Sequence, residues 1–461
     1  MDLITQSILP FVGILLGLIV IHEAGHYFTA KMFGVKVLEA GVGLPPRVWG
    51  FTWRGTDYTI NALPFGAFVR MLGEEDPSDP ESLAAQPKWK RTIIIASGAA
   101  MNLVTAVVLF AVSLMIPTEV SEGGAVITNV IPDSPAARAG ILEGDEILEV
   151  NGRKAENTTD AAYFIRLAQG STVDMKLKRT DPRTGAQVLE KEVYARWDPG
   201  TYVDECGIEK AAGPTGISIG TRHGQFVPVT PEEKADAEKP TREAFREYRE
   251  QVPAGAPASC TDGSQFGFFP LTAAECAELS AEDQAAARAL KDDLFPGSAA
   301  PCYEFEPGPQ FVPFTKTRVQ PPWEAFPNGV RLSFESLILT RNTVWSLLRG
   351  FNSTTASPIT GPVGIAQATG EVVEEAGWLP LITLAGSLSM SLAIINILPL
   401  PMVDGGRLVF IFIELIRRGR RIDPQKEALV HLAGFVALIV IALVITWFDV
   451  ARWVSGDSLL Q

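Results

Sequence analysis

The chain has 461 residues, of which 47% are hydrophobic and 20% are charged, and its formal net charge is −14. This composition excludes a disordered polymer, because hydrophobic residues are abundant, and a nucleic-acid binder, because the charge surplus has the wrong sign to neutralise phosphates. The mean hydropathy is +0.17. A positive value over so long a chain predicts apolar membrane segments beside polar domains rather than a purely soluble protein.

Four apolar runs predict a multi-pass α-helical membrane protein with about four transmembrane helices, since about 20 apolar residues cross the hydrocarbon core of a bilayer. The predicted helices occupy residues 1–30, 92–117, 379–406 and 428–448. No Lys or Arg precedes the first run, so it is interpreted as a retained helix and not as a cleaved signal peptide.

The loops between these helices indicate the orientation of the chain. Residues 31–91 and 407–427 are rich in Lys and Arg, which favours the cytoplasmic side for both. Four crossings then place both termini, including the tail at 449–461, on the extracytoplasmic side. The long segment between the second and third helices lies on that side too.

Residues 118–196 resemble a PDZ domain, which is an α+β fold. AVITNVI is typical of a strand, PDSPAARAGI of a turn with a short helix, and GDEILEVNG of a strand that ends in a turn. PDZ domains as a class accept peptide ends by strand addition, so the resemblance implies peptide binding or substrate gating. The alternative is a domain that only packs against the membrane part, because a fold does not define its ligand.

Residues 197–330 change to Pro, Gly, Ala and acidic residues, which predicts an extracytoplasmic insert of irregular and at most partly helical structure. All four cysteines of the chain lie there, on the side predicted to be oxidising, so one or two disulfides are expected and three pairings are possible. A second zinc site made of these cysteines and His223 is the rival interpretation, but the close CxxC spacing of structural zinc modules is missing. The cysteines are Cys206, Cys260, Cys276 and Cys302.

Residues 331–378 predict an amphipathic helix and a connecting segment. The sequence RLSFESLILTRNTVWSLLRG has apolar residues at helical spacing, with Arg and Glu on the other face. Such a helix either lies along the bilayer surface or packs on the soluble domain, and its amphipathic pattern does not distinguish the two.

Residues 22–26 read HEAGH, inside the otherwise apolar first helix. On a helix His22 and His26 lie one turn apart on the same face, so two imidazoles can bind one Zn2+ ion while Glu23 lies beside the metal-bound water. Polar groups kept inside a membrane helix usually bind something. This favours a zinc metalloprotease site over a helix end that simply meets water.

A catalytic zinc site takes a third protein ligand and keeps one position open for water. Residues 396–406 read NILPLPMVDGG, where Pro399 and Pro401 break the third helix and free backbone groups that only a protein-lined or wet cavity tolerates at that depth. Asp404, at this break, would complete a site of two histidines and one aspartate. His223 and His431 have no motif around them and are interpreted as ordinary residues.

HEAGH in the first helix, NxxPxPxxDG in the third, and a PDZ module between the second and third helices resemble the site-2 protease family of intramembrane zinc metalloproteases. Within that family the likeness is greatest to the bacterial regulator of sigma-E proteases. The resemblance implies that His22, His26 and Asp404 bind zinc and that Glu23 is the general base and acid. It also implies that Asn396 contacts the substrate or the developing oxyanion.

The likeness to this family covers about residues 1–196 and 331–461. GVGLPPRVWGF and YTINALPFGAFVRMLGE look like the family's membrane-associated β-hairpin, which the resemblance assigns to residues 31–91 at the cytoplasmic face. Its strand around Val69 would pair with an unwound substrate segment. Two features depart from the family: its nearest members carry two tandem PDZ domains where one is traced here, and the acidic insert has no counterpart.

The resemblance implies an enzyme of the bacterial inner membrane, surrounded by lipid, that cleaves single-span membrane proteins by zinc-activated water. Anti-sigma factors and remnant signal peptides are substrates of this kind, and the PDZ domain would bind peptide ends.

Two other functions compete with this one. A non-enzymatic membrane-anchored PDZ scaffold would carry a structural metal, but a structural zinc site has four protein ligands and no need for Glu23. A divalent-metal transporter needs polar residues in several helices, whereas the second and fourth helices offer only Asn102 and His431.

Overall fold

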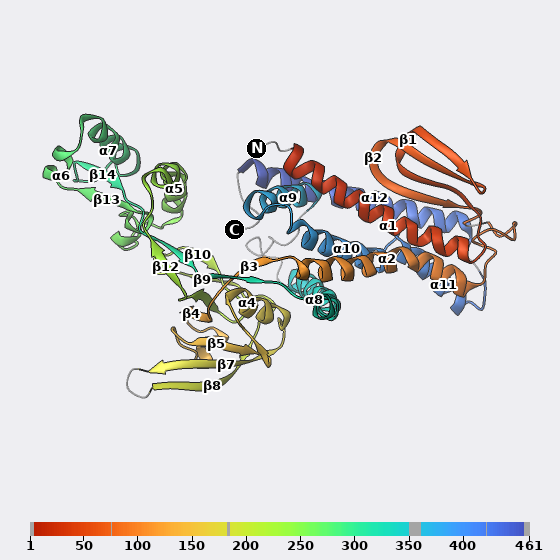
Figure 1. Ribbon diagram of the computed structural model, residues 1–461, viewed down its shortest axis with the longest axis horizontal. Coiled ribbons are helices and arrows are strands. Elements are labelled where there is room, and N and C mark those ends of the chain that lie inside the picture. Colours follow the sequence, from red (N-terminus) through yellow and green to blue (C-terminus); the bar gives the residue numbers. More distant parts are fainter. Residues whose placement is uncertain (1–3, 75, 182–184, 350–360, 421, 456–461) are drawn as a thin grey trace. The chain divides into compact units, whose positions relative to one another are not determined.

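The computed structural model describes residues 4–74, 76–181, 185–349, 361–420 and 422–455 (Figure 1). The chain divides into two compact units. The membrane unit consists of the described parts of residues 1–118, 318–341 and 357–461, and the polar unit consists of those of residues 119–317 and 342–356. Residues 350–360 of the predicted connecting segment and 456–461 of the predicted tail lie outside the described residues.

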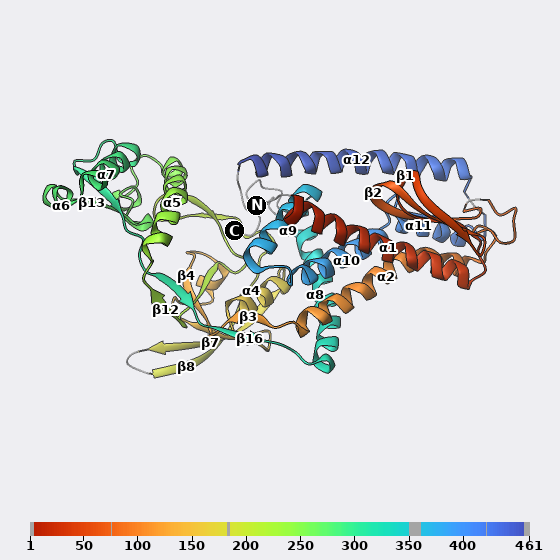
Figure 2. The ribbon, with the colours of Figure 1, turned by 45° about the horizontal axis from the view of Figure 1, so that its top comes forward.

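The membrane unit is built mainly of helices that run in similar directions, with one β-ribbon along α1 (Figures 1 and 2). α1 packs against α2, and α2 packs against α10. A Cβ atom at Gly25 of α1 would lie 2.5 Å from the Ser97 carbonyl oxygen of α2, so a small residue permits this close contact. Besides part of α8, the elements are η1 (Ile4–Ile8), α1 (Leu9–Met32), β1 (Val37–Trp53), β2 (Thr56–Met71), α2 (Lys88–Met115), α9 (Pro362–Ala376), α10 (Leu381–Ile397), α11 (Asp404–Ile416) and α12 (Pro424–Ser455).

Among the described residues, three helices are long and apolar enough to cross a membrane: Ile4–Met32, Lys88–Met115 and Gln425–Ala451. They coincide with the first, second and fourth helices predicted from the sequence. α10, which corresponds to the predicted third helix, has 17 residues. At 1.5 Å per residue it is roughly 26 Å long, less than the roughly 30 Å of the hydrocarbon core. The count of four crossings therefore stays a prediction.

The predicted third helix is divided into two helices around its prolines. α10 ends at Ile397 and α11 begins at Asp404, with irregular backbone between them. Pro399 and Pro401 explain the break, because proline has no N–H to donate to a helix. Residues 407–416, predicted as the start of a loop, are helical and complete α11, because the apolar RLVFIFIELI sequence that follows the break can resume a helix.

β1 and β2 pair antiparallel where the sequence predicts a β-hairpin. Both strands bend back on themselves, so that Ala40 of β1 lies opposite both Tyr58 and Val69 of β2. The first half of β1 is thus flanked by the two halves of β2. Among the described strands, residues 67–71 of β2 pair on one side only. Such an edge presents backbone N–H and C=O groups to which another strand can bind.

The polar unit contains an antiparallel sheet in the order β11-β4-β5-β7-β8, with β6 beside β5. Its core is made of aliphatic side chains such as Ile127, Ile147 and Leu177. The elements before the insert are β3 (Thr118–Ser121), β4 (Ala125–Val130), α3 (Pro135–Arg138), β5 (Glu146–Val150), β6 (Arg153–Lys154), α4 (Thr158–Leu167), β7 (Thr172–Asp181) and β8 (Gly185–Tyr194). The elements that follow are β9 (Thr201–Val203), β10 (Glu209–Ala211) and β11 (Ile217–Thr221).

The sheet extends further along the chain than the predicted end at residue 196. β11 pairs with β4 and forms one edge of the sheet, so at least residues 217–221 belong to this domain rather than to the insert. Along the chain, the short hairpin of β9 and β10 lies between β8 and β11 and forms a sheet of its own, and the composition already changes there. A five-residue edge strand is stabilised by its partner strand, which the local sequence does not reveal.

The acidic insert is more regular than the sequence indicated. Its elements are β12 (Gly224–Val227), α5 (Pro231–Gln251), η2 (Ala258–Cys260), η3 (Ser264–Phe266), β13 (Phe268–Leu271), α6 (Ala273–Glu278), α7 (Ala281–Leu294), β14 (Cys302–Phe305), β15 (Gln310–Pro313) and β16 (Thr315–Arg318). Phe245, Phe268 and Phe295 form the centre of a buried aromatic core. Capping boxes at Thr230 and Thr272 start α5 and α6, so these helices had local signals that composition alone obscures.

Two disulfides tie this insert together. Cys206 is bonded to Cys260, and Cys276 is bonded to Cys302, which selects one of the three possible pairings. Because all four sulfur atoms are consumed, the rival zinc site with His223 is excluded.

α8 (Pro322–Arg349) is the predicted amphipathic helix and begins nine residues earlier than expected. Gly329 lies against α2, where a Cβ atom would be 2.8 Å from the Ala111 nitrogen. Trp323, Phe326 and Phe334 are exposed. Exposed aromatic residues suit a bilayer surface, and this placement of α8 stays a prediction.

Candidate metal centre

α1 presents two histidines on one face, one helical turn apart. His22 and His26 are buried, and their Nε2 atoms lie 3.2 Å apart. Asp404, the first residue of α11, reaches the same point, because its Oδ2 atom lies 3.1 Å from Nε2 of each histidine. Among the described residues, this is the one group of His, Cys, Asp and Glu side chains whose ligand atoms converge closely enough to hold a metal ion.

The triangle of ligand atoms fits a tetrahedral zinc ion. With metal–ligand bonds of about 2.0 Å, neighbouring ligand atoms of a tetrahedron are roughly 3.3 Å apart. The three observed separations are 3.1, 3.1 and 3.2 Å. Two imidazole nitrogens and one carboxylate oxygen are ligands that zinc accepts, and three protein ligands leave the fourth position for water or substrate. The group therefore has the number, type and spacing of ligands that a catalytic zinc site requires.

α2 supports both imidazoles from behind. The Nδ1 atom of His26 lies 2.8 Å from the carbonyl oxygen of Ile94, so Nδ1–H donates there and the Nε2 lone pair is available to a metal. Nδ1 of His22 lies 3.4 Å from the amide nitrogen of the fully buried Asn102, whose Oδ1 atom is buried without a hydrogen-bond partner. Exchanging the two amide atoms of Asn102 would give Nδ1–H of His22 an acceptor and would satisfy that oxygen.

Gly98 makes the close approach of the two helices possible at this point. A Cβ atom at Gly98 would lie 2.5 Å from Nε2 of His26 and 2.6 Å from Nε2 of His22. Ile94, Gly98 and Asn102 are spaced by four residues, which places them on the same face of α2. Their connection with the histidines was not predicted from the sequence. Their spacing within the second apolar run is a signal, but it does not say which helix lies opposite.

Two glycines bring Asp404 into place. A Cβ atom at Gly405 would lie 2.0 Å from the Leu398 carbonyl oxygen, and one at Gly406 would lie 2.3 Å from the Leu400 carbonyl oxygen. Any other residue would therefore push the start of α11 away from the end of α10. The sequence DGG after the proline break is thus required for the turn that directs Asp404 towards α1.

Glu23 lies next to His22 and lines a largely apolar cavity of about 280 Å3. The opposite wall of this cavity is formed by strands of the β1–β2 sheet and includes Val69. The general base predicted from the sequence and the strand predicted to hold the substrate therefore line the same cavity.

Asn396 lies in the last turn of α10, and its amide nitrogen donates to the Leu392 carbonyl oxygen at 2.9 Å. This hydrogen bond lies within the helix of Asn396 itself, so the role of this residue in the site stays a prediction. His223 belongs to the polar unit and His431 to α12, and neither is part of the converging group.

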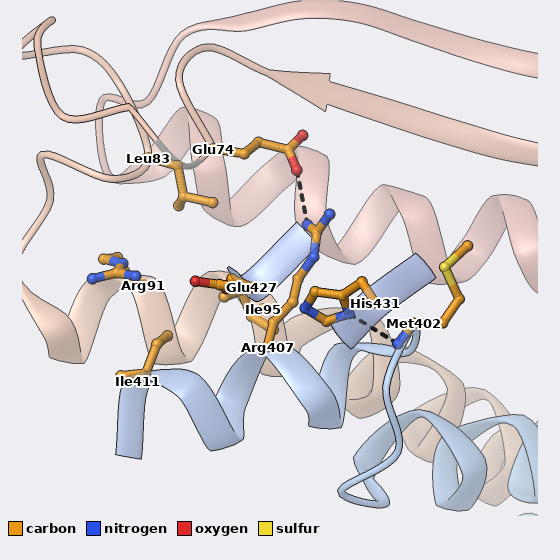
Figure 3. Close-up of a pocket in the computed structure, with 9 residues that line it drawn as sticks. All are labelled: Glu74, Leu83, Arg91, Ile95, Met402, Arg407, Ile411, Glu427 and His431. Atoms are coloured by element: carbon orange, nitrogen blue, oxygen red, sulfur yellow. Dashed lines mark hydrogen bonds and ion pairs between the residues drawn. The ribbon is translucent and has the colours of Figure 1, made fainter. Parts of the chain in front are cut away.

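A second cavity, of about 170 Å3, lies beside the loop that precedes Asp404 (Figure 3). Charged side chains line it, among them Arg407, which forms an ion pair of 2.9 Å with Glu74. His431 of α12 also lines this cavity and points towards the backbone nitrogen of Met402. Nδ1 of His431 accepts a hydrogen bond of 2.9 Å from that nitrogen.

Comparison with known proteins decides the family. The sequence model of peptidase family M50 matches residues 10–441, which is most of the chain and includes the three converging side chains. The chain belongs to peptidase family M50. This is the site-2 protease family, so the resemblance drawn from the sequence is confirmed.

Relatives of this M50 protein cover nearly its whole length. A protein of Thermotoga maritima is 27% identical over 96% of this chain and 99% of its own length. Two proteins named zinc metalloprotease RasP, from Geobacillus kaustophilus and Oceanobacillus iheyensis, are 27% and 26% identical over 97% and 94% of this chain and 98% and 96% of their own lengths. The chain is therefore an integral membrane metalloprotease for which zinc is the expected cofactor.

Proposed function

We propose that this M50 protein is an endopeptidase that hydrolyses single-span membrane proteins within the bilayer. The observation that carries the proposal is the convergence of Asp404 with His22 and His26, which lie beside Glu23 on a helix long and apolar enough to cross a membrane. Ionisable groups are costly in such a helix and are kept there mainly for function. A site at this position acts on peptide bonds that enter the membrane region.

In this mechanism His22, His26 and Asp404 hold zinc, which when bound lowers the pKa of water and polarises the scissile carbonyl group. Glu23 takes a proton from the attacking water and returns it to the leaving amine. Asn396 donates a hydrogen bond to the carbonyl oxygen as negative charge develops on it.

The substrate must be extended at the scissile bond, because the carbonyl group of a helical peptide is already hydrogen-bonded. The edge of β2 at residues 67–71 offers the backbone groups for pairing with an extended segment, and it adjoins the cavity that Glu23 lines. We therefore expect the substrate to add a strand at this edge and to present its carbonyl group towards α1.

In the proposed topology the protein lies in the inner membrane of a bacterium. Both termini and the polar unit are on the extracytoplasmic side. The two disulfides support this side, because disulfides persist in oxidising compartments. The basic loops support the cytoplasmic side for residues 31–91 and 417–427. In this topology α10 and the irregular residues after it also cross the membrane, which brings the number of crossings to four.

The β11-β4-β5-β7-β8 domain is proposed to be a PDZ domain that binds peptide ends. Substrates of the class expected here, such as anti-sigma factors and remnant signal peptides, expose such ends once their outer part has been trimmed. Peptide binding beside the membrane would restrict access to the site by untrimmed proteins.

A single substitution tests the proposed function. Glu23→Gln should abolish cleavage of a tagged single-span substrate in detergent or liposomes while the purified protein keeps its zinc, because the ligands are unchanged and only the base is lost. Glu374→Gln, at an exposed position of α9, is the matched control and should cleave at the wild-type rate. Cleavage by purified Glu23→Gln at the wild-type rate would reject the mechanism.

A further inference from the structure

We propose that α12 positions the loop that carries Asp404, through His431 and Gly434. This inference rests on the proposed function, in which Asp404 is a zinc ligand. His431 is then a positioning residue for the metal site, although it does not contact the three converging side chains.

The loop between α10 and α11 cannot hold its shape by itself. Met402 has a φ angle of +85°, a left-handed conformation that side chains other than glycine rarely adopt. Such a conformation persists only where the surroundings enforce it. Pro399 and Pro401 cannot donate backbone hydrogen bonds that would stabilise the loop. Outside support is therefore needed two residues before Asp404.

His431 provides a polar contact at that position. Its Nδ1 atom accepts a 2.9 Å hydrogen bond from the Met402 backbone nitrogen (Figure 3). The imidazole ring lies 5.4 Å from the ring of Phe410 in α11, measured between centroids. The histidine thus joins α12 to the loop and lies against the helix that Asp404 starts.

Gly434 provides a second and independent contact. It lies three residues after His431, on the same face of α12, and a Cβ atom there would lie 2.2 Å from Cβ of Pro401. Gly434 is buried, whereas its neighbours Leu432 and Phe435 are exposed. α12 therefore approaches the protein closely where it meets the loop, and a side chain at position 434 would push the two apart.

These contacts link the position of α12 to the metal site. Pro401 and Met402 are three and two residues from Asp404, so a shift of α12 would move the carboxylate relative to the two histidines of α1. Loss of a group that orients a metal ligand typically lowers metal affinity by about 10- to 100-fold. If His431 merely lined the polar cavity of Figure 3, its substitution would not change the zinc affinity.

The test compares zinc retention in purified full-length variants during dialysis against a chelator. His431→Leu should lose zinc about 10-fold faster than the wild type. His431→Asn should retain it, because the Asn amide oxygen can take the place of Nδ1, whereas His431→Gln should not. Gly434→Ala should resemble His431→Leu, and Leu432→Ala, at an exposed neighbouring position, should match the wild type.

The outcomes separate this inference from the proposed function. A wild-type protein that binds no zinc would refute the proposed function itself. A wild type that holds zinc, together with His431→Gln and Gly434→Ala variants that hold it equally well, would overturn only the role of α12. Equal zinc loss in Leu432→Ala would also overturn it, because the effect would then come from general weakening of the helix.

Discussion

Replacement of Gly98 by alanine should remove zinc from the site without unfolding the protein. The added Cβ atom would lie 2.5 Å from Nε2 of His26, whereas ordinary contact begins at 3.4 Å, so the ring and the helix must separate by 0.9 Å (3.4 − 2.5). Zinc–ligand distances tolerate deviations of about 0.2 Å. The required displacement is several times larger, so the two imidazoles and Asp404 can no longer share one ion.

The backbone itself should tolerate Gly98→Ala, because alanine in a helix interior is favoured over glycine by roughly 0.5–1 kcal/mol. Gly17→Ala in α1 is the matched control, since a Cβ atom there meets nothing within 4 Å. Zinc content by mass spectrometry, and the absorption spectrum of the Co2+-substituted protein, measure the site directly. Full zinc occupancy in Gly98→Ala would refute the packing of both imidazoles against α2.

Three other substitutions test other parts of the structure. Asn102→Leu removes the amide beside His22 and should lower zinc affinity about 10- to 100-fold in chelator competition. Ser389→Ala, which removes a 2.8 Å hydrogen bond to the Asn102 backbone, is the control. Equal zinc affinities of Asn102→Leu and the wild type would disprove that the Asn102 amide supports His22. Asp404→Asn should also weaken zinc binding, and wild-type zinc content would remove Asp404 from the ligand set. Burial raises the pKa of Asp145, but hydrogen bonds from Arg179 and the Leu142 backbone outweigh this and hold the pKa below its ordinary value. The stability that this lowered pKa contributes is present above the unfolded-state pKa of about 3.9 and is lost as the pH falls through the folded-state pKa. Asp145→Asn should therefore destabilise the sheet by about 1–3 kcal/mol at neutral pH, as measured by hydrogen exchange, with a smaller difference from wild type in acid; a difference independent of pH would contradict this.

Local patterns in the chain were sufficient for the membrane helices and for part of the site. The first, second and fourth apolar runs are helices, because length and hydrophobicity are properties of a segment alone. The HEAGH spacing likewise places His22 and His26 on one face of any helix. The proline break before Asp404 is also a local effect, since proline cannot donate within a helix.

Contacts between distant segments depended on tertiary packing. The proline break made Asp404 a candidate third ligand, but only the fold brings its carboxylate within 3.1 Å of histidines more than 370 residues earlier in the chain. Gly98 and Asn102 acquire meaning only once α2 lies against α1. Tertiary packing also decided three other features: the pairing of the four cysteines, the doubled β1–β2 sheet and the pairing of β11 with β4. Helical periodicity and proline breaks act over a few residues, whereas these contacts depend on how whole elements exclude one another when they pack.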